Sequence, residues 1–459
     1  MLEMRAFMRS DEKTPPVVIL GGGLTGISTA FHLRSPWVLL EKEARLGGHA
    51  RTDVTRGFHF DKTGHWLHLR DPYMKQLIGE LLPDQMVAVE RKARIFSHGA
   101  LTRFPFQANL HGLPPDVIKE CLLGFIEAWQ SPGKDDAPKN FEDFILKKMG
   151  AGIARHFMIP YNAKLYGVHP REITAEWCQR FVPVPKLDDV VAGAVGANPP
   201  EMGYNIRFIY PKTGGIETMT RALIGKLAGG DVHTGTAVEQ IDWRGKKVQM
   251  GGEWMDYRAV VATIPLPVLI SRLVDPPREI ADAGEKLRCT AVRYLNVATK
   301  TPSKSDFHWI YVPEEKYPFY RVGIYTNAVP AMAPDGLGSL YVELSGRGAM
   351  KLDDMMPDMA AALAASGAIN GVDDVLFAEL KEIQYAYVIF DDHYFGATAL
   401  IRAWLESQGI YPRGRYGFWY YNGMEDSLLH GRDVAALLDK DTSAQLSPNP
   451  KNTKLANVH

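Results

Sequence analysis

Three glycines near the N-terminus have the spacing of a phosphate-binding turn. Gly21, Gly23 and Gly26 fit the pattern G-x-G-x-x-G. In this pattern the first glycine permits a tight turn, the second lets the backbone approach a pyrophosphate, and the third lets a helix pack closely on a strand. Glu41 follows twenty residues after Gly21, where a carboxylate can accept hydrogen bonds from an adenosine ribose. The residues expected to bind a dinucleotide, either NAD or FAD, are Gly21, Gly23, Leu24, Thr25, Gly26 and Glu41.

The elements that must position these residues flank the glycines. Residues 17–20 form an aliphatic run typical of a buried parallel strand, and residues 27–34 are helix-like. The glycines would then precede a helix whose free N–H groups face the phosphates. Residues 37–40 predict a second strand. A doubly wound sheet needs more strands, and residues 232–238 and 259–263 are candidates, with a glycine pair at 251–252 marking a turn between two others.

Composition excludes several classes of protein. The chain has 459 residues, with 52 Lys and Arg against 53 Asp and Glu, so it lacks the concentrated positive charge that binding to nucleic acid requires. Its three cysteines are odd in number and far apart, which argues against disulfides and against a zinc site. Neither a signal peptide nor an apolar run long enough to span a membrane is apparent. We therefore expect a cytoplasmic protein without a metal or a membrane span.

A second motif follows the predicted ribose acid. Arg45, Gly47 and Gly48 complete an E-x-x-x-R-x-G-G run that begins at Glu41. This run resembles the extended signature of the two-dinucleotide-binding-domain flavoproteins, which include amine oxidases, protoporphyrinogen oxidase, phytoene desaturases and UDP-galactopyranose mutases. The resemblance implies that the cofactor is FAD. It adds the following cofactor residues: Lys42, Arg45, Gly47, Gly48, Val238 beside the adenine, and Arg415 beside the pyrophosphate or the flavin ring.

Segments farther along resemble the UDP-galactopyranose mutase family, more its eukaryotic branch than its bacterial one. The matching segments, in order, are FDKTGHWLH (60–68), FPFQANL (104–110), FMIPYNAKLYGV (157–168), EWCQR (176–180), NIRFIYPKTGG (205–215), YPFYRVGIYTN (317–327) and GRYGFWYYN (414–422). In that family N5 of the reduced flavin attacks the anomeric carbon of a nucleotide sugar, without net redox. The resemblance therefore implies that reduced FAD is the active form, maintained by a reductant such as NAD(P)H or a reductase.

The same resemblance implies roles for individual side chains. Arg180 and Arg321 would bind the diphosphate of a nucleotide-diphosphate sugar, a role suited to the planar and permanently charged guanidinium. His65 would lie beside the isoalloxazine as a neutral imidazole. The remaining implied ligand contacts are Tyr387 and Tyr421 to the diphosphate, Phe106, Gln107, Asn162 and Tyr166 to the uridine, and Asn205 to the sugar or flavin.

The chain departs from the family pattern on the ligand-facing side. Phe104, Ala108, Tyr166 and Tyr420 stand where the family typically has tyrosine, asparagine, tryptophan and arginine. Changed polar groups alter ligand discrimination strongly, so the sugar and the nucleotide stay open. Two other functions also stay open. One is an oxidoreductase like the amine or protoporphyrinogen oxidases, and the other is a flavin-bound protein with a binding or assembly role.

The predicted fold is α/β, with a discontinuous Rossmann-like FAD-binding domain, a helical insert and an antiparallel sheet. We expect the FAD-binding domain to comprise residues 15–105, 205–272 and 405–440, the helical substrate or interaction domain to comprise 106–204, and the antiparallel sheet to comprise 273–404. Residues 441–459 are expected to be a disordered tail. Self-association into a homo-oligomer is left open.

Overall fold

The protein is described by a computed structural model that covers residues 14–133, 136–178, 182–197, 207–344 and 351–445. One lobe is built on a five-stranded parallel sheet with the strand order β19-β13-β1-β2-β9. Its strands span β1 (Val17–Leu20), β2 (Trp37–Leu40), β9 (Gly230–His233), β13 (Ala259–Ala262) and β19 (Ile410–Pro412). Every side chain of β1, β2 and β13 is buried, because a parallel sheet is covered on both faces.

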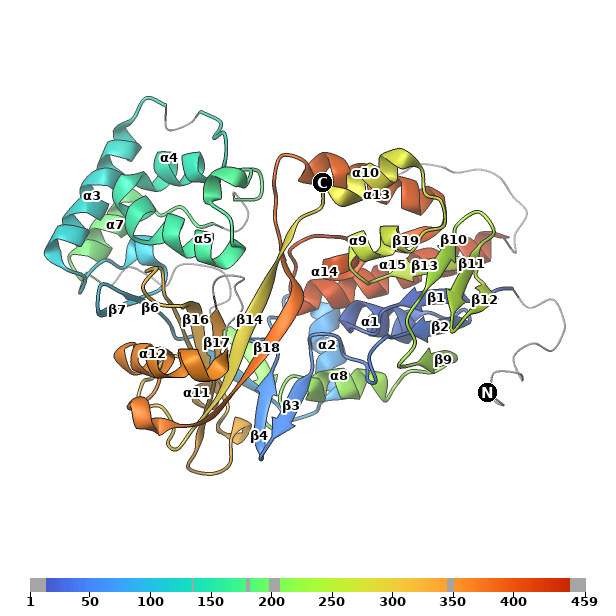
Figure 1. Cartoon of the computed structure of the whole chain (residues 1–459), viewed down its shortest axis with the longest axis horizontal. Coiled ribbons are helices and arrows are strands. Elements are labelled where there is room, and N and C mark those ends of the chain that lie inside the picture. Colours follow the sequence, from blue (N-terminus) through green and yellow to red (C-terminus); the bar gives the residue numbers. More distant parts are fainter. Residues whose placement is uncertain (1–13, 134–135, 179–181, 198–206, 345–350, 446–459) are drawn as a thin grey trace.

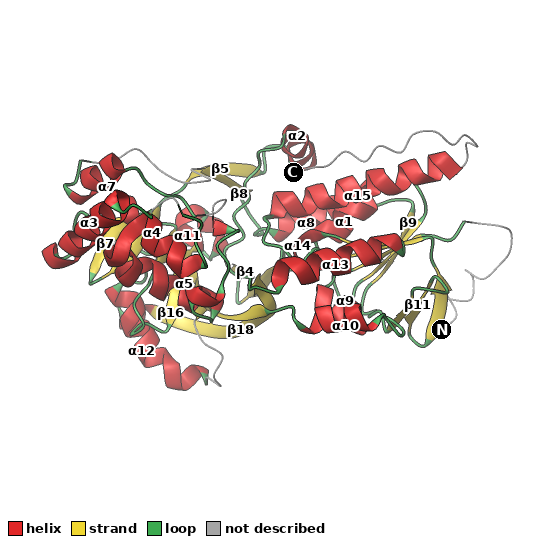
Figure 2. Ribbon diagram, turned by 90° about the horizontal axis from the view of Figure 1, so that it is seen from above, coloured by secondary structure: helices red, strands yellow, loops and turns green. Residues whose placement is uncertain are grey.

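The first and the last helix of the described chain meet beside this sheet. Helix α1 (Leu24–His32) packs against the long C-terminal helix α15 (Met424–Gln445), and Figure 2 shows the two helices side by side. The Thr25 and Ser28 hydroxyls donate to the Ser427 and Leu428 carbonyls at 2.9 and 2.6 Å. The C-terminal helix therefore completes the unit that the N-terminal glycine turn begins.

Smaller elements surround the parallel sheet. The helices on or near it are α2 (Pro72–Leu81), α8 (Glu217–Ile224), α9 (Leu266–Ser271), α10 (Arg278–Glu285), α13 (Tyr394–Ser407) and α14 (Gly414–Gly417). The short antiparallel pairs are β3 (Thr52–Thr55) with β4 (Phe58–Asp61) and β5 (Met86–Glu90) with β8 (Arg207–Pro211), and a three-stranded sheet joins β10 (Gln240–Asp242), β11 (Lys247–Met250) and β12 (Glu253–Asp256). The predicted turn at 251–252 connects β11 to β12.

A seven-stranded sheet in the order β18-β14-β17-β16-β15-β6-β7 forms the centre of the second lobe. Its strands are β6 (Ala93–Ser97), β7 (Ala100–Arg103), β14 (Cys289–Thr299), β15 (Trp309–Tyr311), β16 (Phe319–Ile324), β17 (Gly338–Leu344) and β18 (Val375–Val388), with α11 (Tyr325–Ala328) and α12 (Leu352–Ala365) beside them. In Figure 1 the long β14 and β18 ribbon connects this lobe to the parallel-sheet lobe.

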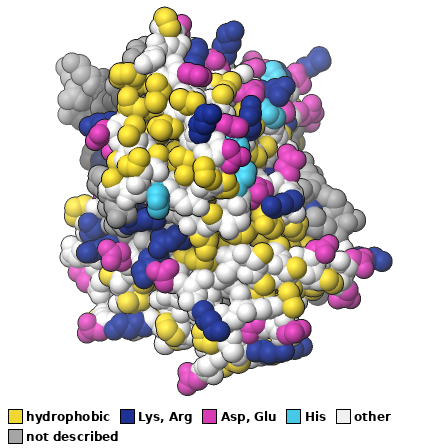
Figure 3. All heavy atoms as spheres, turned by 90° about the vertical axis from the view of Figure 1, so that its left-hand side faces the viewer, with side chains coloured by type: hydrophobic (Ala, Val, Ile, Leu, Met, Phe, Trp, Pro, Cys, Tyr) yellow, Lys and Arg dark blue, Asp and Glu magenta, His cyan; other side chains and the backbone are white. Residues whose placement is uncertain are grey.

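The helical insert lies against the sheet at the far end of the molecule (Figure 1). It consists of α3 (Pro115–Gln130), α4 (Phe141–Ile153), a π-helical turn over Ala154–Met158, α5 (Ile159–Tyr166) and α7 (Leu187–Ala194). Apolar side chains gather on the face shown in Figure 3; the exposed ones on these helices include Leu123, Trp129, Leu146 and Val191. The predicted fold class is thus confirmed.

The structure shifts several of the predicted domain boundaries. Strands β6 and β7 pair in the seven-stranded sheet, although they precede residue 105. Helices α10 and α13 pack on each other, and α13 packs on β19, so they join the parallel-sheet lobe although they lie within 273–404. Helix α15 extends to Gln445, past the expected start of the tail, and residues 446–459 lie outside the described part. Pairing partners distant in sequence decide these boundaries, and local periodicity does not reveal them.

Candidate functional site

The glycine turn has the geometry of a pyrophosphate cradle. Gly21 has a φ of +99°, and a Cβ at Gly26 would overlap the Gly21 carbonyl oxygen, so the turn and the helix packing require these two glycines. Gly23 is different, because its φ of −77° suits any residue and a Cβ there would meet only the Gly48 Cα, at 3.9 Å. The protein's own packing leaves space at Gly23, which fits a cofactor that closely approaches the backbone.

Neighbouring residues support this turn mainly through the backbone. The Glu41 carboxylate is buried and accepts from the Gly22 N–H at 2.7 Å and the Glu43 N–H at 2.9 Å. Lys42 is exposed, and its Nζ lies 3.8 Å from the Glu43 carboxylate. The N-terminus of α1 has no side-chain cap, so the first N–H groups of the helix, including those of Leu24 and Thr25, remain available to an anion.

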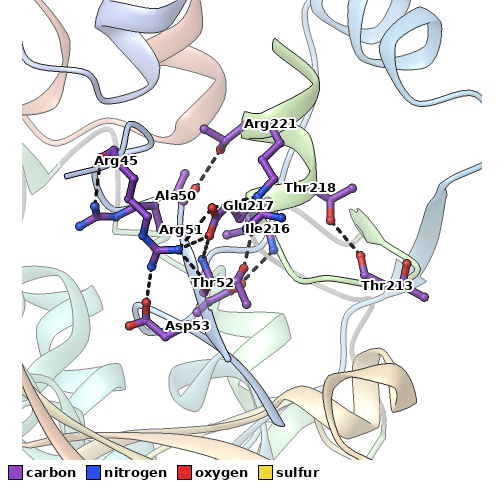
Figure 4. Close-up of polar contacts among 12 residues, drawn as sticks. Arg45, Ala50, Arg51, Thr52, Asp53, Thr213, Ile216, Glu217, Thr218 and Arg221 are labelled. Carbon is purple, nitrogen blue, oxygen red and sulfur yellow. Dashed lines mark hydrogen bonds and ion pairs between the residues drawn. The ribbon is translucent and has the colours of Figure 1, made fainter. Parts of the chain in front are cut away.

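Arg45 is held by protein carboxylates rather than pointing freely toward a cofactor (Figure 4). Its guanidinium pairs with Asp53 and, at 3.0 Å, with the Glu217 carboxylate. Glu217 also accepts from the Thr52 N–H at 2.9 Å and from Arg221 at 3.0 Å. In this structure Arg45 therefore fastens the loop that contains the glycine pair at 47–48 to the N-terminus of α8.

The same network continues into the core. The Thr52 hydroxyl accepts from the Glu217 N–H at 3.1 Å and donates to the Asp61 carboxylate at 2.6 Å. Asp61 also accepts from the Tyr210 hydroxyl and from the Ile216 N–H. Burial raises the pKa of Asp61 to about 7, partly offset by these hydrogen bonds. The loop, the β3–β4 hairpin and the start of α8 thus form one hydrogen-bonded unit.

Three buried polar atoms in or near the loop that follows Gly48 have no hydrogen-bond partner among the residues that the structure describes. They are His49 Nδ1, His65 Nδ1 and Arg51 Nε. Burial, reinforced by the Arg415 charge, lowers the pKa of His65 to about 4, and burial also lowers the pKa of His49. Both imidazoles are therefore neutral near pH 7. Unpaired buried polar groups are costly, so their grouping fits a polar cofactor such as a flavin at this position.

Arg415 connects this area to the expected substrate side. Its guanidinium donates to the Asn422 and Ala386 carbonyls at 2.8 and 3.0 Å. It also lies 4.7 Å from the centroid of the Tyr421 ring and 5.5 Å from that of Tyr387, within range of cation–π attraction. The Arg415 charge also contributes to the lowered pKa of the His65 imidazole. Arg415 therefore lies between the expected flavin side and two tyrosines predicted to bind the diphosphate.

Arg321 lies beside the same tyrosines. Its Nη2 donates to the Glu343 carboxylate at 2.5 Å and to the Tyr387 hydroxyl at 3.1 Å. Arg321 and Glu343 face each other across β16 and β17, and Glu343 is only 1% exposed. Tyr387 and Tyr421 stack with ring centroids 6.2 Å apart. The structure thus brings together Arg321, Tyr387, Tyr421 and Arg415.

The four predicted uridine contacts serve the protein interior in this structure. Phe106 is fully buried and stacks on Phe157 with ring centroids 4.9 Å apart. Gln107 donates to the Pro183 carbonyl at 2.9 Å, and Asn162 donates to the Met158 carbonyl at 2.7 Å.

Tyr166, the fourth, is 5% exposed and packs edge-on against Tyr387. Phe157 in turn stacks on the partly buried Tyr161. Val238, expected beside the adenine, is also buried, in the segment after β9. Arg180 and Asn205 lie outside the described residues.

Sequence reasoning missed three parts of this site. Glu343 is an acid within the otherwise apolar strand YVEL, and that isolated acid was the available signal. Tyr161 belongs to the quoted PYN segment but was not singled out. The partners of Arg45 were not identifiable, because Glu217 is 172 residues away.

The glycine turn and the parallel sheet define a dinucleotide-binding fold, to which a second lobe built on the seven-stranded sheet is attached. The model of the flavin containing amine oxidoreductase family matches residues 24–366, which is more than half of the chain. The chain therefore belongs to this family, and a flavin cofactor is implied.

Known proteins resemble the chain to different extents. Polyamine oxidase 3 of Oryza sativa subsp. japonica is 28% identical over 133 residues, which cover 28% of this chain and 27% of the relative. The chain spans about a quarter of the length of the curated relatives it matches.

Two solved structures share the fold over nearly all of the chain. A reduced UDP-galactopyranose mutase superimposes with a TM-score of 0.88 at 24% identity, covering 95% of both chains. A putative protoporphyrinogen oxidase from Exiguobacterium sp. superimposes with a TM-score of 0.71 at 15% identity, covering 94% of this chain and all of the other.

Two features are absent from the described ranges. No three or more His, Cys, Asp or Glu side chains gather there in a way that could hold a metal ion. None of the helices in these ranges is long and apolar enough to cross a bilayer.

Proposed function

We propose that the protein is a flavin-dependent mutase that interconverts the pyranose and furanose forms of a nucleotide-diphosphate sugar similar to UDP-galactose. The observation that carries this proposal is the convergence of Arg321, Arg415, Tyr387 and Tyr421. Two guanidiniums and two phenols are suited to a diphosphate leaving group, and a simple amine oxidation has no need of them. Superposition with the mutase structure over 95% of both chains supports the proposal.

Arg321, Tyr387 and His65 have separate roles in the proposed reaction. Arg321 stabilises negative charge on the departing diphosphate, and Tyr387 donates its hydroxyl proton to a phosphate oxygen while it accepts from Arg321. Burial raises the pKa of Tyr387, so the phenol remains protonated and able to donate. His65 is a neutral imidazole that accepts or donates one proton beside the cofactor. When bound, reduced FAD would supply a nucleophilic ring nitrogen.

Glu343 limits the charge of this site. Its carboxylate already neutralises much of the Arg321 charge, so the pair presents a dipole with oriented N–H groups. A fully buried, unpaired guanidinium would be costly before ligand binding. We infer that Glu343 keeps Arg321 charged and oriented in the free protein, where the Arg321 Nε is buried and has no hydrogen-bond partner among the described residues.

The alternative is an oxidoreductase that acts on an amine or a porphyrinogen. It is favoured by the family to which the chain belongs and by sequence relatives that include two polyamine oxidases and a coproporphyrinogen III oxidase. The tyrosines around Arg415 would also suit a cationic amine, since aromatic faces attract cations. Arg415 disfavours it, because its guanidinium donates to two uncharged backbone carbonyls and its charge repels such a substrate.

A direct assay separates the two functions. The purified flavoprotein is reduced with dithionite and incubated with UDP-galactofuranose, and the sugar products are separated by chromatography. Conversion only in the reduced state supports the mutase. No conversion of several nucleotide sugars, together with bleaching of the oxidised flavin by an amine or a porphyrinogen, would favour the oxidoreductase instead.

Substitution of Arg321 then tests its proposed role in binding the diphosphate. Arg321→Ala should abolish conversion while the yellow flavin spectrum is retained, because the residue serves the substrate side. Arg155→Ala is the matched control, since Arg155 is an exposed arginine that pairs with Glu120 on the helical insert. Loss of the flavin in Arg321→Ala, or unchanged turnover, would count against the assignment of Arg321.

A further inference from the structure

A lysine beside the candidate site is surrounded by backbone carbonyl oxygens. Lys164 lies on α5, and its ammonium donates to four carbonyls, three in the segment that joins β15 to β16 and one at the first residue of β16. The acceptors and distances are Val312 at 3.0 Å, Glu314 at 2.9 Å, Tyr317 at 3.0 Å and Phe319 at 2.6 Å. All four of these partners are uncharged groups, so the arrangement is a carbonyl cage around a cation and not an ion pair.

The cage makes the shape of residues 312–319 depend on a cation. Four carbonyl dipoles point their negative ends at one place, where they repel one another unless a positive group lies between them. An ammonium has three N–H donors and no acceptor, so two of the four carbonyls share one N–H, and the positive charge attracts all four dipoles without a counter-charge. Burial lowers the pKa of Lys164 to about 7, while the nearby Glu314 and Glu315 carboxylates act in the opposite direction. The four converging oxygens favour the charged form, because a neutral amine would turn its lone pair toward a carbonyl oxygen. A neutral side chain of similar length would leave buried carbonyls unpaired.

The cage lies next to the residue proposed to bind the diphosphate. Phe319 opens β16 and precedes Arg321 by two residues. The pairing of β16 with β17 is irregular between Phe319 and Arg321, where the register shifts. Such irregularities change the direction of nearby side chains. Lys164 therefore holds the backbone at the point where the strand sets the direction of the Arg321 side chain toward Glu343 and Tyr387.

We propose that Lys164 is a positioning residue. Its ammonium is an internal cation that orders residues 312–319 and thereby fixes the direction of the Arg321 side chain. The carbonyl cage is a binding site for a primary ammonium group. Truncation to alanine removes three carbons and the nitrogen, so n-propylammonium should refill it. The effect on ligand binding rests on the proposed function, whereas the effect on the order of β16 does not.

The experiment uses the full-length flavoprotein with Lys164→Ala. Lys147→Ala is the matched control, because Lys147 lies on the same insert and pairs with Asp143 outside the cage. Hydrogen exchange detected by mass spectrometry follows the peptide covering 312–324, and calorimetry measures the affinity for UDP. In Lys164→Ala we expect amide exchange in this peptide to rise at least about tenfold and UDP to bind at least about tenfold more weakly, with full flavin content. Added n-propylammonium should reverse both effects, while tetramethylammonium, which has the charge but no N–H donor, should not.

Each outcome bears on the proposal. Unchanged exchange and unchanged UDP affinity in Lys164→Ala would overturn it, and so would rescue by both cations alike. Faster exchange with unaltered UDP affinity would show a structural role only. If wild-type protein does not bind UDP, the proposed function fails, while exchange and its rescue still test the cage. If Lys164→Ala does not fold, Lys164→Gln replaces it, because glutamine has two N–H donors and no charge. We expect amide exchange in Lys164→Gln to lie between that of the wild type and that of an empty cage. Exchange equal to that of the wild type would refute the need for a cation.

Discussion

Replacement of Gly23 tests the cofactor site with little effect on the rest of the protein. The backbone at Gly23 is in the extended region, with φ −77° and ψ −177°, and a Cβ would meet only the Gly48 Cα, at 3.9 Å. Gly23→Ala should therefore change the free energy of unfolding of the flavin-free protein by no more than about 0.5 kcal/mol. The same methyl group would enter the space where the pyrophosphate must approach the backbone.

The expected loss of FAD affinity follows from the hydrogen bonds at stake. A hydrogen bond to a charged group contributes about 1.5–3 kcal/mol, so losing two backbone N–H contacts to phosphate costs at least about 3 kcal/mol. That corresponds to more than about a hundredfold in Kd. The assay is titration of flavin-free protein with FAD, followed by the quenching of flavin fluorescence, beside chemical unfolding of the same samples.

Two other glycines provide the controls. Gly79→Ala, on α2, meets nothing within 4 Å; it should leave FAD affinity unchanged and stabilise the helix by up to about 1 kcal/mol. Gly26→Ala should instead destabilise the flavin-free protein, because its Cβ overlaps the Gly21 carbonyl. Wild-type FAD affinity in Gly23→Ala, or unfolding as severe as that of Gly26→Ala, would refute the reasoning.

Three further changes have defined outcomes. Glu217→Gln removes the carboxylate that holds Arg45, and it should cost about 2 kcal/mol of stability and weaken FAD retention. Thermal unfolding with and without FAD measures both effects. A loss of stability no larger than that of Arg221→Ala, which removes an exposed partner of Glu217, would contradict this prediction. Burial lowers the pKa of His308 to about 4, below the unfolded value of about 6.5, so its neutral form contributes stability above pH 6.5 that is lost as the pH falls toward 4. His308→Gln should therefore cost less stability at pH 5 than at pH 7 in urea unfolding, and an equal cost at both would argue against a neutral buried imidazole. Tyr387→Phe should weaken UDP binding by about 1 kcal/mol without loss of flavin, measured by calorimetry, and unchanged affinity would remove Tyr387 from the site.

The strands beside the glycine turn show which elements the local sequence predicts. Strands at 17–20 and 37–40 were predicted with the bounds that the structure has, because an aliphatic run beside a glycine turn has few alternative structures. The strand expected at 232–238 instead covers Gly230–His233, since Val238 is buried by packing outside the sheet. Strand ends depend on partners in the neighbouring strand, which the local pattern does not contain.

On the expected substrate side, the sequence did not predict how individual side chains are used. The PFQ and PYN segments suggested a ligand-facing wall, but Phe106 is covered by Phe157, and the Gln107 and Asn162 amides bond to backbone carbonyls. A residue type is compatible with either use, and only its neighbours in space decide between them. Arg321 and Tyr387 were both named from sequence, yet their mutual hydrogen bond and the Glu343 carboxylate between strands came from the fold.

The sequence by itself determined the dinucleotide turn, the order of the strand and helix segments around it, and the residue types available for a diphosphate. These properties are local, since glycine spacing and apolar periodicity act within a few residues along the chain. Only the tertiary structure decided that Arg45 fastens a loop, that Glu343 restrains Arg321, and that Lys164 fills a carbonyl cage. Each of these depends on groups brought together from distant parts of the chain, because electrostatic and hydrogen-bonding roles are set by distance in space.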